Sequence, residues 1–182
     1  MWAVDALTDA GLGLDYDALR FERTTDRWLI AGGELRDWVA KSLDSVAARV
    51  EPIGSSSVLG LLAKPILDLA VGLSAQHDLT EVTTTLETSG WIYRGDAGEN
   101  GGHVFVLEAR PRYRVAHVHV IEYGGPQWRN YLRFRDLLRS SSAACGRYEA
   151  VKLRLAGEPG HDRKAYQDGK SAIVSSLLRS AE

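Results

Sequence analysis

Sulfur-containing residues are nearly absent from the 182-residue sequence, which has one cysteine, Cys145, and one methionine. A single cysteine excludes an intrachain disulfide and fits a protein of the reducing cytoplasm, which is where we expect this chain. No apolar run approaches the length of a membrane span, and residues 1–20 lack a basic start followed by an apolar core. We therefore expect neither a membrane partner nor export.

An excess of basic residues is also missing, because 22 lysines and arginines are balanced by 24 aspartates and glutamates, for a net charge of −2. Nucleic-acid-binding proteins usually carry a basic patch, so we expect no nucleic-acid partner. The chain has no internal repeat and no low-complexity segment. Its length and its apolar fraction of 45% are ordinary for a soluble globular protein, and they predict a single domain over residues 1–182.

The most informative segment lies between residues 50 and 73, where the pattern predicts a strand, a Gly-Ser turn, one or two apolar helical turns and a second strand. In the second strand Asp68 is the only charge on a face of small or apolar groups, and a buried carboxylate is costly unless it is paired, protonated or coordinated. The alternation places Leu67, Leu69, Val71 and Leu73 on one face, and Ile66, Asp68, Ala70 and Gly72 on the other.

The turn before this strand places Gly54 and Ser55 at the expected start of a short helix. Free N–H groups and a hydroxyl at such a position favour an anion. An anion-binding turn beside a metal-binding carboxylate is the arrangement that phosphoryl and nucleotidyl transfer require. Spacing alone leaves a second interpretation open, in which a tight turn adjoins a hydrogen-bonded core aspartate.

Two antiparallel strands are predicted at 103–109 and 113–121, after a glycine-rich loop at 96–102 that we expect near an active cleft. His117 and His119 point the same way along the second strand. They either lie on a solvated strand face or line a cleft in which a histidine binds a metal or phosphate or moves a proton. The alternation assigns Ala116, Val118 and Val120 to the core, and Val115, His117, His119 and Ile121 to the opposite face.

Helices are predicted at 34–50, from Asp78 to Gly90, and from Pro126 onward. In the last of these, Arg135 shares a stripe with Trp128 instead of lying on the solvated side. An arginine in that position requires an anion, which is either a ligand phosphate or a carboxylate such as Asp68 or Glu122.

Two Tyr-x-x-x-Lys pairs follow near the C-terminus, Tyr148 with Lys152 and Tyr166 with Lys170. At this helical spacing each pair can present a phenol and an ammonium group to one anion. Each lysine can equally lie over its tyrosine and reach water. Periodicity does not decide between these two interpretations.

The segment from Gly54 to Asp68 resembles the signature of the GrpB-like family, a branch of the polymerase-β-like nucleotidyltransferase superfamily. The resemblance spans residues 48–178 and implies an α+β fold, in which helices flank a mixed β-sheet and a helical segment lies at the C-terminus. It is carried by Gly54-Ser55-Ser56-Ser57-Val58, Gly60-Leu61, Ala63-Lys64-Pro65-Ile66, Asp68, His117-Val118-His119-Val120, Phe134-Arg135-Asp136, Leu138-Arg139, Tyr148-Glu149-Ala150-Val151-Lys152, and Tyr166 with Lys170.

The resemblance implies a Mg²⁺-dependent nucleotidyltransferase, or a nucleotide-using ligase, that takes ATP or another nucleoside triphosphate and acts on a small metabolite. Asp68 and His119 are then expected to hold the metal. The expected catalytic group is Asp68, His117, His119 and Arg135, and the expected phosphate-binding group is Gly54, Ser55, Ser56, Lys64, Lys152, Tyr166 and Lys170.

Two departures from the family pattern keep alternatives open. Ala70 occupies the position of the second carboxylate, and Leu59 stands where the family commonly has proline. Two-metal nucleotidyl transfer uses several carboxylates, because hard divalent ions prefer oxygen ligands. A nucleotide- or metabolite-binding module without catalysis is therefore one alternative. Another is a nucleotide-independent cyclase or isomerase that uses His117 and His119. The sequence does not predict the oligomeric state.

Overall fold

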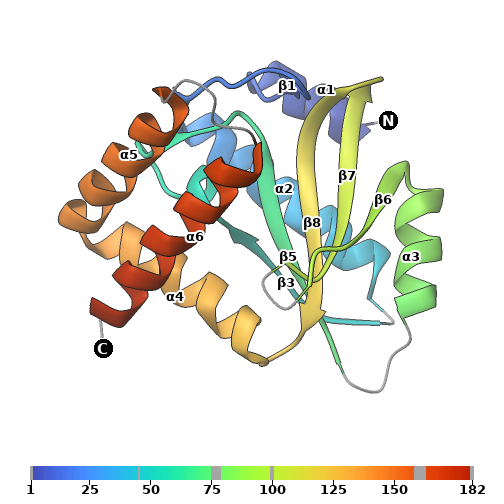
Figure 1. Cartoon of the computed structure of the whole chain (residues 1–182). Coiled ribbons are helices and arrows are strands. Elements are labelled where there is room, and N and C mark those ends of the chain that lie inside the picture. The colour runs from blue at the N-terminus through green and yellow to red at the C-terminus, as the bar shows by residue number, and fades with distance from the viewer. Residues whose placement is uncertain (1, 45, 75–78, 99–100, 158–162, 181–182) are drawn as a thin grey trace.

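The computed structural model describes residues 2–44, 46–74, 79–98, 101–157 and 163–180 and contains a mixed β-sheet flanked by helices (Figure 1). The sheet has the strand order β3-β5-β8-β7-β6, and β1 pairs with the first two residues of β8. Strands β5 and β8 are parallel, and the other neighbours are antiparallel. The strands of this sheet are β1 Leu14–Asp15, β3 Ala47–Ile53, β5 Leu67–Leu73, β6 Trp91–Asp96, β7 His103–Arg110 and β8 Tyr113–Glu122.

Six α-helices and one 3₁₀ turn occupy the described part of the chain. A separate two-stranded sheet pairs β2 Glu22–Arg23 with β4 Leu62–Ala63. None of the described helices is long and apolar enough to cross a bilayer. The helices are α1 Trp2–Asp9, α2 Asp26–Ser42, α3 Leu79–Thr88, α4 Pro126–Ser140, α5 Ser142–Gly157 and α6 Arg163–Ser180, and the 3₁₀ turn is η1 Ser55–Ser57.

The two faces of the large sheet are covered by different helices (Figure 1). Helices α1, α2 and α3 bury apolar side chains against one face and form the main core. Helix α4 packs on the other face through Trp128, which contacts Ile53, Ala70 and Ile121. Helices α5 and α6 extend this side by packing on α4 and on the segment that follows η1.

The predicted alternation along β5 is confirmed. Leu69 and Val71 belong to the main core and are fully buried, whereas Ala70 packs under α4 on the opposite face. Along β8 the prediction is confirmed for Ala116, Val118 and Val120 but is wrong for Val115, which is also part of the main core. The pairing of β7 with β8 shifts at this point, because Val115 has no partner between the pairs Leu107–Ala116 and Glu108–Arg114. At such a bulge the alternation is interrupted, and the side chains of Val115 and Ala116 both belong to the main core.

The predicted helix at 34–50 has the wrong limits, since α2 begins at Asp26 and ends at Ser42. Val46 and Val50 are buried as expected, but Val50 lies in strand β3 and Val46 directly precedes it. Both residues happen to continue the helical spacing, and their β-branched side chains suit the strand equally well. The predicted helix from Asp78 to Gly90 corresponds to α3, which spans Leu79–Thr88, and its predicted first residue, Asp78, lies outside the described residues.

Candidate functional site

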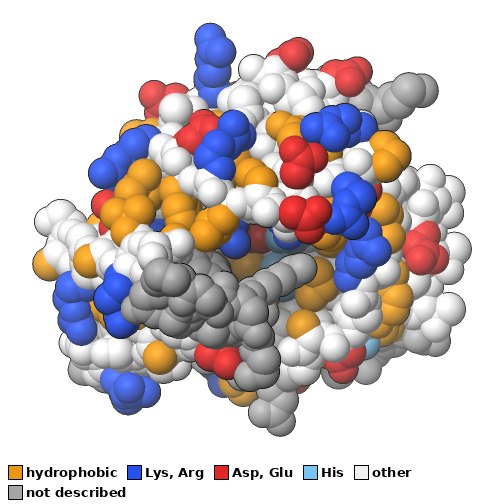
Figure 2. Space-filling model, turned by 45° about the horizontal axis from the view of Figure 1, so that its top comes forward, with side chains coloured by type: hydrophobic (Ala, Val, Ile, Leu, Met, Phe, Trp, Pro, Cys, Tyr) orange, Lys and Arg blue, Asp and Glu red, His pale blue; other side chains and the backbone are white. Residues whose placement is uncertain are grey.

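Strand pairing brings Asp68, His117 and His119 together on the face that α4 covers. In the parallel register Asp68 lies beside His117, and Ala70 lies beside His119. Asp68 Oδ1 lies 3.1 Å from His117 Nδ1 and 3.8 Å from His119 Nε2. The three side chains are 29%, 20% and 19% exposed, so the group keeps an open side. Figure 2 shows histidine side chains inside a hollow near the centre of the molecular surface.

The orientation of His119 is fixed by a backbone carbonyl from the glycine-rich loop. Its Nδ1 lies 3.0 Å from the oxygen of Gly101, and because a carbonyl only accepts, Nδ1 carries the hydrogen. Nε2 therefore faces Asp68. The ring of Tyr131, from α4, lies edge-on to His119 with 5.7 Å between centroids.

The electrostatics of this group favour an ionised carboxylate. Burial acts to raise the pKa of Asp68, but hydrogen bonds and charges from His117 and His119 outweigh it and hold that pKa below its usual range. Burial lowers the pKa of the His117 imidazole, and the neighbouring Asp68 only partly offsets this effect. A carboxylate beside two imidazole nitrogens is a donor set for a divalent cation. It fits Mg²⁺ poorly, because Mg²⁺ prefers oxygen ligands.

The Gly-Ser turn approaches the carboxylate closely. Gly54 has φ of +69°, and a Cβ atom built on it would lie 3.0 Å from Asp68 Oδ2. Glycine is required here by both the backbone conformation and the available space. The helix that follows is a single 3₁₀ turn, η1, which spans Ser55–Ser57 and agrees with the shorter of the one or two turns predicted. Any anion-binding property of this turn must therefore come from nearby side chains.

Lys152 is a buried lysine that contacts the Ser55 hydroxyl. Its Nζ donates to Ser55 Oγ at 3.3 Å and to the carbonyl oxygen of Leu62, and it lies 4.3 Å from the centroid of the Tyr148 ring. Lys152 is only 2% exposed, and no described carboxylate lies within ion-pair distance of it. Burial, with a contribution from Lys170, lowers the pKa of Lys152 to about 7.

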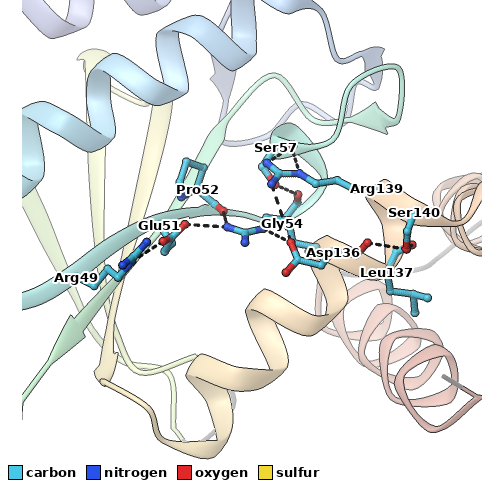
Figure 3. Close-up of polar contacts among 10 residues, drawn as sticks. Arg49, Glu51, Pro52, Gly54, Ser57, Asp136, Leu137, Arg139 and Ser140 are labelled. Carbon is cyan, nitrogen blue, oxygen red and sulfur yellow. Dashed lines mark hydrogen bonds and ion pairs between the residues drawn. The ribbon is translucent and has the colours of Figure 1, made fainter. Parts of the chain in front are cut away.

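Arg135 is held by carboxylates other than the two that we predicted. Its Nη1 donates to Glu51 Oε2 at 2.9 Å, and its Nε donates to Asp136 Oδ1 at 2.8 Å. Figure 3 shows Glu51 between Arg49 and the α4 residue Asp136. The expectation of Asp68 or Glu122 as its partner is therefore wrong. The structure does not bring Arg135 into contact with the Asp68 group, and its catalytic role stays a prediction.

The remaining predicted residues are distributed around the turn. Lys64 follows β4 and is half-buried, and Lys170 is half-buried on α6. Ser56 is buried in η1. The side chain of Tyr166 lies outside the described residues.

Ser56 and Asp68 also line a cavity of about 180 Å³ between α2, η1 and β5. Trp28 and Gly32 of α2 form part of its wall, together with Arg139 of α4. Arg139 donates two hydrogen bonds to the Ser57 carbonyl, at 3.2 and 2.8 Å (Figure 3). The cavity has the size of a small organic molecule.

Sequence reasoning missed several parts of this region. Glu51 pairs with Ala70 across the β3–β5 ladder and so shares the Asp68 face. It lies in the strand predicted before the Gly-Ser turn, but it was not considered as a partner of Arg135. The Gly101 carbonyl leaves no signal in the sequence, because every residue has one. Tyr131 flanks the stripe of Trp128 and Arg135 at helical spacing, and this was the available signal for it.

Comparisons with known proteins agree with this architecture. The family model described as GrpB protein matches residues 20–180. A UPF0157 protein of Deinococcus radiodurans is 36% identical over 134 residues, which cover 74% of this chain and 68% of that protein. A UPF0157 protein of Streptomyces coelicolor is 34% identical over 163 residues, which cover 90% of this chain and 80% of that protein.

Solved structures show the same fold. The crystal structure of the conserved protein GrpB from Enterococcus faecalis superposes with a TM-score of 0.74 at 25% identity, over 89% of this chain and 99% of that one. The Cid1 poly(U) polymerase with Mg and 3′-dATP bound gives a TM-score of 0.50 at 13% identity, over 85% of this chain and 45% of that one. The fold is therefore nucleotidyltransferase-like, and the chain belongs to the GrpB protein family.

Proposed function

We propose that this protein binds a nucleoside triphosphate such as ATP and, with a divalent metal ion, transfers a nucleotidyl group to a small metabolite or activates that metabolite for ligation. The observation that carries the proposal is the position of Lys152. This buried cation contacts the Ser55 hydroxyl, one residue from the glycine that lies against Asp68. The Gly54-Ser55 turn thus lies beside both the Lys152 ammonium group and the ionised Asp68 carboxylate with its two histidines.

The charges of this arrangement suit a polyphosphate. A phosphate placed at Ser55 brings negative charge to Lys152, which raises the pKa of its ammonium group and favours the protonated form. Lys152 and the Ser55 hydroxyl then neutralise and position the phosphates, while Asp68 and its histidines provide the metal-binding side. Positioning and charge stabilisation account for most of the catalysis in phosphoryl-group transfer.

The acceptor is proposed to be a small molecule with an acidic group. The cavity of about 180 Å³ is lined by Asp68, Ser56 and Arg139. Two N–H groups of Arg139 donate to the Ser57 carbonyl, and the remaining donors of its guanidinium are proposed to bind the acidic group. The likeness of fold to Cid1, which was solved with Mg and 3′-dATP bound, supports nucleotide use.

The test is a titration with each nucleoside triphosphate and a divalent cation, followed by melting temperature and by pyrophosphate release. Bound nucleotide is expected to raise the melting temperature, since a ligand at 100 times its Kd contributes about 2.7 kcal/mol. Lys152→Met and Ser55→Ala are expected to weaken binding at least tenfold. Lys41→Met, an exposed lysine on α2, is the matched control and is expected to bind normally. Equal affinity of Lys152→Met and wild type would refute the proposal.

A nucleotide-independent cyclase or isomerase is the second candidate. The 3.1 Å contact between Asp68 and His117, with His119 beside it, is an acid–base group that needs no phosphate. This function predicts no nucleotide-induced thermal shift at any metal concentration. A nucleotide-induced rise in melting temperature, without pyrophosphate release on a broad panel of metabolites, would instead favour the non-catalytic binding module that Ala70 suggests.

A further inference from the structure

We propose that Asp68, His117 and His119 form a site for a divalent transition-metal ion such as Zn²⁺, and that this site selects against Mg²⁺. The inference concerns the same face as the proposed function but requires no nucleotide. It rests on the geometry of the three side chains, on the hydrogen bond that orients His119, and on the chemistry of the donor atoms.

The three donor atoms are close enough to bind one ion. One oxygen or nitrogen atom from each residue lies within 4.8 Å of the other two. Ligand bonds of about 2.0–2.2 Å place neighbouring donors about 3–3.5 Å apart. Asp68 Oδ1 already lies 3.1 Å from His117 Nδ1 and 3.8 Å from His119 Nε2, so small side-chain rotations complete the set.

The backbone of the glycine-rich loop orients His119 as a ligand. Because Nδ1 donates to the Gly101 carbonyl, the lone pair of Nε2 in the neutral ring points at the Asp68 carboxylate. A cation between these two electron-rich atoms relieves their repulsion, and it is either a proton on Nε2, which then donates to the carboxylate, or a metal ion. Metal-binding histidines usually donate their second ring nitrogen to a carbonyl or carboxylate in this way, which fixes the tautomer.

The donor types discriminate between metals. Imidazole nitrogen suits zinc, iron, copper and nickel, whereas magnesium takes oxygen ligands. Two histidines and one carboxylate form a three-ligand set that leaves open positions on the ion. In this protein the partly exposed side of the three residues supplies those positions to water or to a substrate oxygen. Ala70 removes the second carboxylate from β5, which weakens the site for magnesium further.

A purely structural interpretation treats the contact between His117 and Asp68 as a simple hydrogen bond. In that case His117 Nδ1 donates to the carboxylate and has no free lone pair. Metal binding requires the hydrogen to move to the other ring nitrogen, so the two interpretations differ in whether the protein takes up metal at all.

The test is a titration of the chelator-treated protein with Co²⁺, whose visible absorption reports nitrogen and oxygen coordination, followed by competition with Zn²⁺ and then Mg²⁺. We expect one Co²⁺ per chain, displacement by Zn²⁺, and no displacement by Mg²⁺ at millimolar concentration. His119→Gln and Asp68→Asn are expected to lower Co²⁺ affinity at least tenfold. His103→Gln is the matched control, because this β7 histidine contacts the Tyr93 hydroxyl and lies outside the group.

The melting temperature of each variant, measured without metal, separates loss of the site from loss of the fold. Unchanged Co²⁺ binding in folded His119→Gln, or displacement of Co²⁺ by Mg²⁺ as readily as by Zn²⁺, would overturn the inference. No nucleotide is present in the titration, so a failure of the nucleotide proposal leaves this result intact. Nucleotide binding at Lys152 and Ser55 is measured separately, by the thermal shift of the proposed function.

Discussion

The two faces of the β-sheet differ in what they bury. The face under α1, α2 and α3 holds a continuous apolar core in which Leu69 and Val118 are fully buried. The face toward α4 carries Asp68, His117 and His119, and Glu51 with its arginine partner lies on the same side. Because buried polar groups are costly, their concentration on one face makes that face the candidate for ligand binding or catalysis.

A pair of neighbouring substitutions on β5 and β8 tests this difference most strongly. Leu69→Ala removes a fully buried side chain from the core face and is expected to cost about 2–5 kcal/mol of unfolding free energy. His119→Gln on the other face loses one hydrogen bond of a partly exposed ring and is expected to cost about 1 kcal/mol. Urea unfolding measures both, and similar losses would contradict the comparison.

The ion pair of Arg135 is expected to have the next largest effect. Arg135→Met removes one of the two arginines that pair with Glu51 and leaves Arg49 as its described partner. Because Glu51 is only 16% exposed, we expect the unfolding free energy to fall by about 2 kcal/mol. Arg129→Met, an exposed arginine on the same helix, is the control with an expected loss of about 0.5 kcal/mol or less. If Arg135 instead serves a ligand, its substitution will weaken nucleotide binding and leave urea unfolding nearly unchanged.

The Gly54 turn is expected to combine a modest loss of stability with a large loss of binding. Gly54→Ala forces an alanine into φ of +69°, which costs about 1–2 kcal/mol, and its Cβ meets Asp68 Oδ2. Gly60→Ala is the matched control, since Gly60 has φ of +76° and no atom near the new Cβ. We expect similar unfolding free energies for the two variants and weakened Co²⁺ binding for Gly54→Ala alone.

The smallest expected effect is the pH dependence contributed by Lys152. Its pKa is about 7 in the folded protein and about 10.4 in an unfolded chain, so between these values the unfolded state binds more protons. Folded stability should therefore rise with pH through this window, by about 1 kcal/mol between pH 7 and 8. Lys152→Met should lose that slope, whereas Lys41→Met should keep it. Urea unfolding at pH 7 and pH 8 measures this change in unfolding free energy. An equal change in Lys152→Met and in the wild type would refute the assignment of the pH dependence to Lys152.

The family resemblance implied that Asp68 and the two histidines share a site, but the surroundings of that group were not predicted. Alternation along β8 predicted only that the two histidines lie on one face of their strand, and it did not predict that this strand pairs with the strand of Asp68. The partner of Arg135 depends on which strand lies under α4, and the alternation within the predicted strand that holds Glu51 does not show this. The Gly101 hydrogen bond and the cavity beside Ser56 arise from tertiary packing, which leaves no periodic signal.

The central claim is that a polyanion and its counter-cation share the face around Asp68. The most direct measurement is an anomalous difference map from crystals grown with Zn²⁺ and a nonhydrolysable ATP analogue. We predict a peak within bonding distance of Asp68, His117 and His119, and phosphate density against Ser55 Oγ and Lys152 Nζ. Zinc bound at other residues, with the nucleotide absent from the Ser55 turn, would contradict it.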